Sequence, residues 1–161
     1  MKWIKEYFIK KALVKAKQAK KAQPLAERID RVGIVASSLV ELNETKEVIT
    51  PLLQAHTEII GLFYGEGIEV KEAFSYEDFT LSGKPKNNIT DFMENKVDLI
   101  IASAENLNVF SLYLLYLNPQ SYSVGFYHES HAPYMDLMLA KEDLDQKGNM
   151  EHLLKYLKQV I

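Results

Sequence analysis

The stretch Val97-Asp98-Leu99-Ile100-Ile101-Ala102-Ser103 is a short apolar run with three β-branched residues and no strict alternation. Strands that are covered on both faces have this pattern, because neither face needs polar side chains. Helical patterns lie on both sides of the stretch in the chain. Residues 97–103 therefore predict the central strand of a parallel sheet.

Other apolar stretches extend this sheet. Residues 31–37 and 58–64 read as two strands joined by a helix, with Asn43 as its expected N-cap, and this order gives a right-handed parallel unit. Residues 122–127 and 135–140 predict two more strands. The fold class is therefore α/β: three layers, α/β/α, around a mostly parallel sheet of about five strands in the order 2-1-3-4-5.

Two features of the sheet are expected at its edges. Residues 70–76 could add a short edge strand. The last strand is expected to run antiparallel, because the connection from residue 128 is too short for a helical crossover. Asn88 is the expected cap of a short helix that ends at Glu94, and Asn149 that of a final helix that ends at Gln159.

A helix predicted over residues 106–117 is apolar on nearly every side. Such a helix is buried on more than one side. The side that carries Tyr113 and Tyr116 could therefore be buried in a homodimer, with enclosure by neighbouring helices of the same chain as the alternative.

Composition limits the classes of protein. A chain of 161 residues suits one domain with a sizeable core, and the absence of Cys excludes disulfides and thiolate chemistry. No apolar run approaches the ~18 residues of a membrane span, and the charged N-terminus lacks the apolar core of a secretory signal. We expect a cytoplasmic protein with a basic N-terminal helix over residues 1–23 and a single α/β domain over residues 24–161.

Charge is distributed unevenly along the chain. Residues 1–23 hold eight Lys and one Glu, a balance of +7, whereas residues 24–161 carry −10. A basic arm on an acidic body predicts a non-enzymatic binding module whose arm contacts an anionic partner. The lysines expected to bind this polyanion are Lys10, Lys11, Lys15, Lys17, Lys20 and Lys21.

The partner of this arm is expected to be RNA, ribosomal RNA included, slightly ahead of an anionic membrane surface. Lysines on several sides with few aromatic residues after Phe8 suit phosphate contact. The membrane alternative rests on Trp3, Ile4, Tyr7 and Phe8 beside lysines. A third interpretation is a helix that docks on its own domain and keeps its lysines in water.

The carboxyl ends of the strands offer a second candidate site, since parallel sheets bind ligands there. Its possible ligand residues are Ser37, Ser38, Glu66, Ser103, Glu105, His128 and His131. The chain has no nucleophile elbow, phosphate-binding loop or H-E-x-x-H motif. We therefore expect no metal and no cofactor, and a small-ligand-binding protein or an enzyme at these strand ends is the alternative function.

Five short motifs occur in a recognisable order along nearly the whole chain. They are Val32-Gly33-Ile34-Val35, Val97-Asp98-Leu99-Ile100-Ile101, Tyr122-Ser123-Val124-Gly125-Phe126, Met135-Asp136-Leu137-Met138 and Leu154-Lys155-Tyr156-Leu157. Together with the basic N-terminal helix, this set resembles a small family of proteins of unknown function found mainly in Bacteroidota. The resemblance implies the length and element order of that family and carries no activity.

Overall fold

A computed structural model describes residues 1–15, 24–87 and 89–160 of the chain. The helices are α1 (Lys2–Lys15), α2 (Leu39–Ile49), α3 (Ile89–Glu94), α4 (Val109–Tyr116) and α5 (Gln146–Val160). The strands are β1 (Arg31–Ala36), β2 (Glu58–Tyr64), β3 (Ala73–Phe74), β4 (Leu99–Ala102), β5 (Tyr122–Phe126) and β6 (Leu137–Leu139). Three 3-10 helices are η1 (Thr50–Leu52), η2 (Tyr76–Asp78) and η3 (Glu129–Tyr134).

The six strands form one parallel sheet in the order β3-β2-β1-β4-β5-β6. The predicted α/β class and the order of the five main strands are confirmed, and the edge strand expected within residues 70–76 is present over two residues. The expected antiparallel last strand is wrong. β6 runs parallel to β5, because the chain crosses back through η3 and needs no α-helix to do so.

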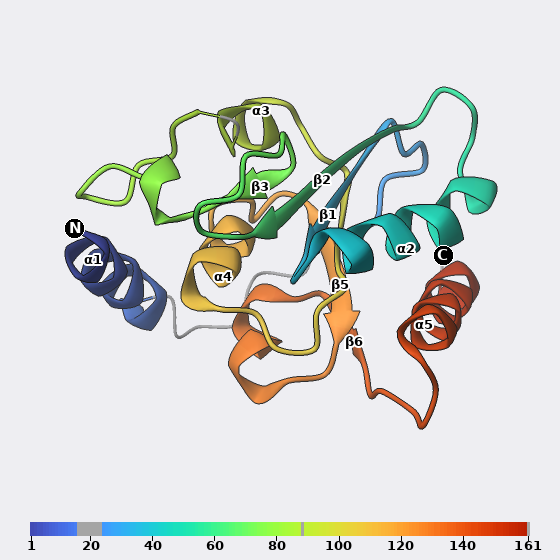
Figure 1. Cartoon of the computed structure of the whole chain (residues 1–161). Coiled ribbons are helices and arrows are strands. Elements are labelled where there is room, and N and C mark those ends of the chain that lie inside the picture. The colour runs from blue at the N-terminus through green and yellow to red at the C-terminus, as the bar shows by residue number, and fades with distance from the viewer. Residues whose placement is uncertain (16–23, 88, 161) are drawn as a thin grey trace.

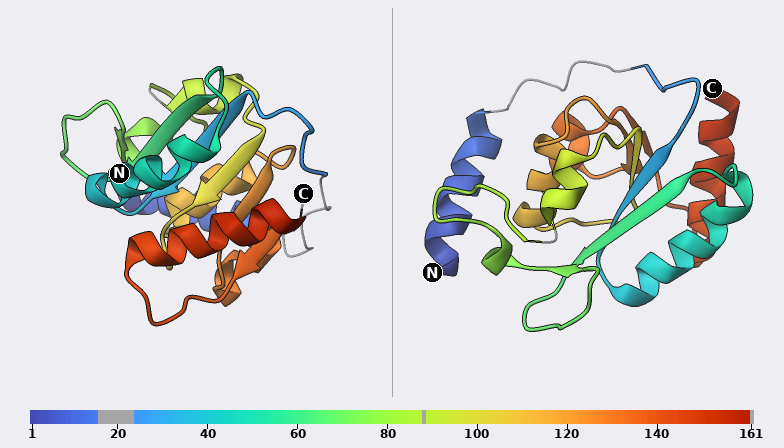
Figure 2. Two further views of the ribbon diagram at one scale, coloured as in Figure 1. Left: turned by 90° about the vertical axis from the view of Figure 1, so that its right-hand side faces the viewer. Right: turned by 90° about the horizontal axis from the view of Figure 1, so that it is seen from above.

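The helices cover both faces of the sheet (Figure 1). α2 and α5 lie together on one face, α3 and α4 lie on the other, and α1 packs outside α4 as a further layer (Figures 1 and 2). One apolar cluster fills each interface between the sheet and its helices. Of the predicted core residues, Ile60 is partly buried. The others are all buried, namely Val32, Ile34, Val35, Leu62, Leu99, Ile100, Ile101, Phe110, Leu114, Val124 and Phe126.

Two predicted helix starts are wrong, because nearby polar groups offer better hydrogen bonds. α2 begins four residues before Asn43, where the Ser38 hydroxyl accepts a hydrogen bond from the Glu41 N–H. Asn149 lies within α5, and its side chain accepts from the Glu142 N–H while its amide faces preceding carbonyls. The predicted short helix is present as α3, whereas its expected cap, Asn88, lies outside the described residues.

α4 begins at Val109, later than predicted, because the Asn108 side chain caps it through the Ser111 N–H. Tyr113 is buried and Tyr116 is half-buried within the single chain, where α1 packs across α4. The chain's own N-terminal helix thus covers a side of α4 that the sequence suggested for a homodimer. The homodimer itself stays a prediction.

Candidate functional site

The inner face of α1 docks this helix on the rest of the molecule. Ile9 and Leu13 are buried in the same apolar cluster as α4, and the Tyr134 hydroxyl donates to the Leu13 carbonyl at 3.1 Å. Lys5 is also buried, and its ammonium donates to the Tyr76 carbonyl at 3.1 Å. These contacts fix the rotation of α1 and so decide which of its side chains face outward.

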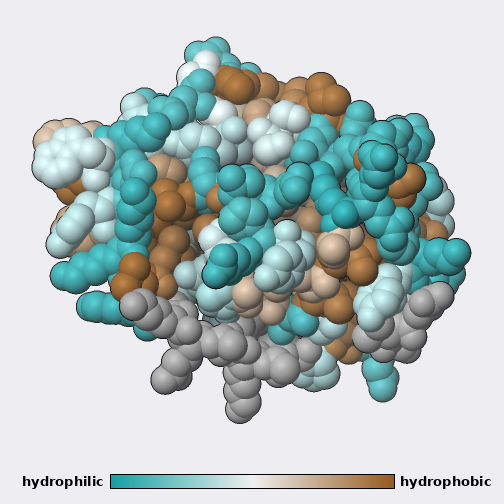
Figure 3. Space-filling model, turned by 90° about the horizontal axis from the view of Figure 1, so that it is seen from below, coloured by the Kyte–Doolittle hydropathy of each residue, from teal (hydrophilic) through white to brown (hydrophobic). Residues whose placement is uncertain are grey.

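The outer face of α1 is apolar and aromatic to an unusual degree. The exposed fractions are 70% for Trp3, 58% for Tyr7, 42% for Phe8 and 55% for Val14, whereas Ile4 is half-buried. On the left of Figure 3, where α1 lies, pale and brown side chains stand directly beside teal ones. Apolar side chains grouped on an outer face mark an interaction surface.

Apart from the buried Lys5, the lysines of α1 fall into two groups. Lys2 pairs with Glu66 at 2.8 Å and Lys10 with Glu6 at 3.1 Å, so both are partly neutralised. Lys11 and Lys15 are exposed, and neither has a carboxylate at ion-pair distance among the described residues. The other lysines predicted to bind a polyanion, Lys17, Lys20 and Lys21, lie outside the described residues.

At the carboxyl edge of the sheet, two of the predicted serines meet on one carboxylate. The Ser37 hydroxyl donates to Glu41 Oε2 at 2.9 Å, and the Ser103 hydroxyl donates to Glu41 Oε1 at 2.9 Å. β1 and β4, which these serines follow, are the neighbours between which the chain's winding reverses. The serine and carboxylate groups therefore occupy the switch point of the sheet, with Ser38 beside them as the α2 N-cap.

The sequence interpretation missed Glu41, the carboxylate at the centre of this network, and also Gln146. The signal for Glu41 was the Ser38-x-x-Glu41 spacing of a capping box. The carboxylate accepts from the N–H of Ser37 rather than from that of the cap residue, so it reaches back to the end of β1. The network continues from the Ser103 carbonyl to the Gln146 amide at 2.7 Å.

Glu105 approaches this network only indirectly. The Lys141 ammonium donates to Gln146 Oε1 at 2.9 Å, lies 3.7 Å from Glu105 Oε2 and sits over the Phe126 ring. The hydrogen bonds around Glu41 pair each carboxylate oxygen, so the arrangement ties β1, α2 and β4 together. It contains no histidine that could activate either serine.

A cleft of about 560 Å³ opens between α1 and the carboxyl ends of the strands. Glu66 lines it together with Lys2 and Lys10, the segment 106–110 before and within α4, and Ser130. Tyr64 also belongs to its lining, and its buried hydroxyl has no hydrogen-bond partner of normal geometry among the described residues. The basic helix and the strand ends, predicted as separate sites, thus share one cleft.

The two histidines predicted as ligand residues, His128 and His131, both accept hydrogen bonds from backbone N–H groups. His131 is fully buried, accepts from the Leu107 N–H at 3.0 Å and stacks on His128 with 4.7 Å between ring centroids. Burial, assisted by the charge of His128, lowers the pKa of His131 to about 4, so the ring is neutral at pH 7. His128 Nδ1 accepts from the Ser130 N–H at the start of η3.

Comparison with known families covers almost the entire chain. The model of one family of unknown function matches residues 5–160, which include the whole sheet and most of α1. The chain belongs to this family, DUF6913. No curated protein matches it.

DUF6913 is a family of unknown function, so a function for this chain has to be inferred from the geometry of its candidate sites. Within residues 1–15, 24–87 and 89–160 of this DUF6913 chain, no three His, Asp or Glu side chains gather as metal ligands would. Across the same residues, no helix combines the length and the apolar character needed to cross a bilayer. The features that remain are the outer face of α1, the cleft beside it and the network at Glu41.

Proposed function

We propose that this DUF6913 protein is a binding module that attaches to an anionic membrane surface through the outer face of α1. The observation that carries the proposal is the exposure of Trp3, Tyr7 and Phe8 next to Lys11 and Lys15. A helix with this composition lies in the membrane interface, where aromatic side chains enter the headgroup region and lysines contact lipid phosphates. Docking through Ile9 and Leu13 keeps α1 on the body while its outer face binds.

The acidic body supports one orientation of binding. Residues 24–161 carry −10, so an anionic surface repels the body and attracts only the basic segment 1–23. We therefore expect α1 to face the surface and the sheet to point away from it. In keeping with the sequence, we assign this surface to the cytoplasm.

RNA, the ribosomal form included, is the second candidate partner. The +7 balance of residues 1–23 suits phosphate contacts, and exposed aromatic rings also stack on unpaired bases. We rank the lipid surface first because Val14 adds an aliphatic side chain to the exposed patch, and an aliphatic side chain gains from insertion into lipid but offers no ring for a base.

The test uses the full chain and two kinds of vesicle, one of phosphatidylcholine alone and one that also contains the anionic lipid phosphatidylglycerol. Trp3 is the only Trp of the chain, so its fluorescence reports on α1 directly. We expect a blue shift and co-sedimentation with anionic vesicles only, both weakened by salt. Trp3→Ala with Phe8→Ala should abolish co-sedimentation, whereas Tyr127→Ala, at an exposed aromatic residue elsewhere, should not.

A second pair of variants separates the partners. Lys11→Gln with Lys15→Gln should weaken binding to vesicles and to RNA, and replacing all six predicted lysines by Gln should flatten the salt dependence. Binding to a single-stranded RNA that survives Trp3→Ala with Phe8→Ala, without vesicle binding, would assign the face to RNA. Binding to neither at low salt would remove the proposal.

A ligand-binding role at the strand ends is favoured by one observation: Tyr64 lines the cleft of about 560 Å³, and its buried hydroxyl has no hydrogen-bond partner of normal geometry among the described residues. A hydroxyl buried without a partner costs free energy that a bound polar molecule could recover. A metabolite screen by thermal shift, repeated with Tyr64→Phe, tests this alternative. A ligand whose stabilising effect disappears in the variant would support it.

A further inference from the structure

The outer edge of β2 is open along most of its length. On one side, β2 pairs with β1 from Glu58 to Phe63. On the other side, β3 pairs only with the end of the strand, at Phe63 and Tyr64. In the described parts of the chain, no strand lies beside residues 58–62 on that side.

Every second residue of β2 directs its backbone N–H and C=O groups toward this open side. The Glu58 N–H donates to Asp30 on the β1 side, whereas the Phe63 N–H donates to Glu72 on the β3 side. Because successive residues of a strand alternate in direction, the N–H and C=O groups of Ile59 and Gly61 face outward. Among the described residues, neither Ile59 nor Gly61 has a hydrogen-bond partner on that side.

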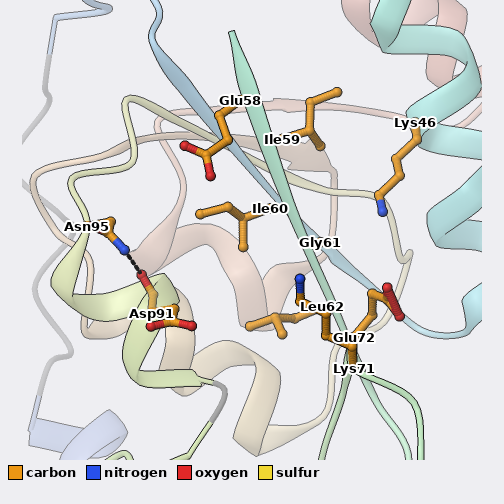
Figure 4. A pocket seen from close by; sticks show the side chains of 10 residues that line it. All are labelled: Lys46, Glu58, Ile59, Ile60, Gly61, Leu62, Lys71, Glu72, Asp91 and Asn95. Carbon is orange, nitrogen blue, oxygen red and sulfur yellow. Dashed lines mark hydrogen bonds between the residues drawn. The ribbon is translucent and has the colours of Figure 1, made fainter.

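Side chains from α2, from the region of α3 and from the segment before β3 turn this edge into a groove. The cleft along residues 58–62 has a volume of about 420 Å³. Figure 4 shows Lys46 of α2 on one side of β2, with Asp91 of α3 and Asn95, just after the end of α3, on the other. No carboxylate or basic group of the described residues lies at ion-pair distance from Lys46 or Asp91.

The sequence of β2 suits an edge that receives another strand. A Cβ on Gly61 would lie 2.4 Å from Leu42 of α2, so glycine lets the helix pack close against this edge. Ile59 and Ile60 pack against opposite core clusters and stay partly exposed. Open edges usually carry Pro, Lys or a bulge that blocks pairing, and residues 58–62 contain neither Pro nor Lys.

We propose that this groove binds an extended peptide segment of another protein, which adds as a strand beside β2 in line with β3. The outward groups of Ile59 and Gly61 supply its main-chain hydrogen bonds. Side chains of an added strand alternate between the two faces. The segment therefore carries an acidic residue toward Lys46, a basic residue toward Asp91, and apolar residues against Ile59 and Ile60.

The length of the groove favours a short segment over a second copy of this chain. β3 pairs with β2 from Phe63 onward, so the unpaired edge of β2 covers the five residues 58–62, a length of about 16 Å. The β2 strand of a second copy has seven residues and already has its own β3 beside it, so it fits a five-residue stretch less well than a short peptide does.

A random heptapeptide library displayed on phage, screened against the full-length protein, tests the proposal. Enriched peptides should carry an acidic and a basic residue at positions of opposite parity, between β-branched or aromatic residues. The strongest is then measured as a free peptide. Lys46→Glu should weaken its binding at least fivefold, whereas Lys155→Glu, at an exposed lysine of α5, should leave it within twofold.

Two further changes test the pairing itself. Ile59→Pro removes an outward N–H without removing a bond to β1 and should weaken binding at least tenfold, whereas Ile59→Thr keeps that N–H and should retain most binding. Because the proline variant could fail to fold, N-methylation of the peptide provides an independent test. N-methyl groups on the residues whose N–H groups face β2 should abolish binding, whereas N-methyl groups on the alternate residues should not.

Three results of the peptide experiments would overturn the proposal. They are a library without enriched peptides, equal binding of the two N-methylated peptides, and binding that Lys46→Glu leaves unchanged. The proposal would also be overturned if light scattering showed that the protein is a dimer and that Ile59→Pro dissociates it, since a second copy would then occupy the groove.

Discussion

The Lys5 ammonium lies 3.1 Å from the backbone carbonyl oxygen of Tyr76, although 71 residues separate the two in the chain. It also lies 5.5 Å from the centre of the Tyr76 ring. A helix with lysines on most sides has a weak preference for any one rotation. The Lys5 contact supplies that preference, because only one rotation of α1 buries Ile9 and Leu13 and satisfies the ammonium as well.

Lys5→Met keeps the apolar stem of the side chain and removes its charged donor. We expect a loss of about 1.5–3 kcal/mol in the free energy of unfolding, the usual contribution of a hydrogen bond to a charged group. Hydrogen exchange in residues 2–15 should accelerate more than exchange in β1 or β4. Lys11→Met, at an exposed lysine of the same helix, serves as the control. Equal effects of the two variants would show that Lys5 does not fix α1.

Ile100→Asp should unfold the domain. Ile100 is fully buried in β4, and an unpaired carboxylate there costs more than most domains have in net stability, about 5–15 kcal/mol. Circular dichroism and a thermal melt report the outcome. Val40→Asp is the matched control, because Val40 is 67% exposed in the first turn of α2, where an acidic residue is favourable. A folded Ile100→Asp protein with an unchanged melting temperature would contradict the central position of β4.

The order of the sheet was predictable because each main strand is an apolar stretch between turn signals, and residues 97–103 carry the strongest such pattern. Helix boundaries were less predictable. Ser38 and Asn43 are both good N-cap residues, and the choice between them depends on where β1 ends in space. The direction of β6 depends on η3, whose compact 3-10 path has no periodic pattern in the sequence.

The candidate sites show the same limit. The sequence identified Ser37 and Ser103 as residues at strand ends, but the carboxylate that joins them comes from α2, which packs on the sheet over β1 and β2. The outward direction of Trp3 and Tyr7 depends on the docking of Lys5, which no local pattern encodes. The open edge of β2 results from the shortness of β3, a tertiary property.

Stability should fall in mildly acidic solution because of His131. Its pKa is about 4 in the folded chain and about 6.5 when unfolded. Between these values the unfolded state binds a proton that the folded state excludes, so the free energy of unfolding decreases as pH falls from about 6.5 to about 4. The decrease attributable to this group is at most about 3 kcal/mol.

Urea unfolding of the wild type and of His131→Gln across this pH range measures the effect. Glutamine retains an acceptor for the Leu107 N–H and does not titrate. The wild-type curve should therefore be steeper with pH than that of the variant. Parallel curves would show that His131 takes up its proton without opening the fold.

The contact between Ser103 and Glu41 should couple β4 to α2 energetically. Ser103 is fully buried and its hydroxyl donates to Glu41 at 2.9 Å, so Glu41→Ala leaves a buried donor without this acceptor and should cost about 1–3 kcal/mol. Ser103→Ala removes the same bond from the other side. In a double-mutant cycle, the two losses should sum to more than the loss in the double variant, with a coupling of at least about 0.5 kcal/mol. Additive losses would mean that the hydroxyl finds another acceptor, such as the Val35 carbonyl 3.5 Å away, and that Glu41 acts only on α2 through Ser37.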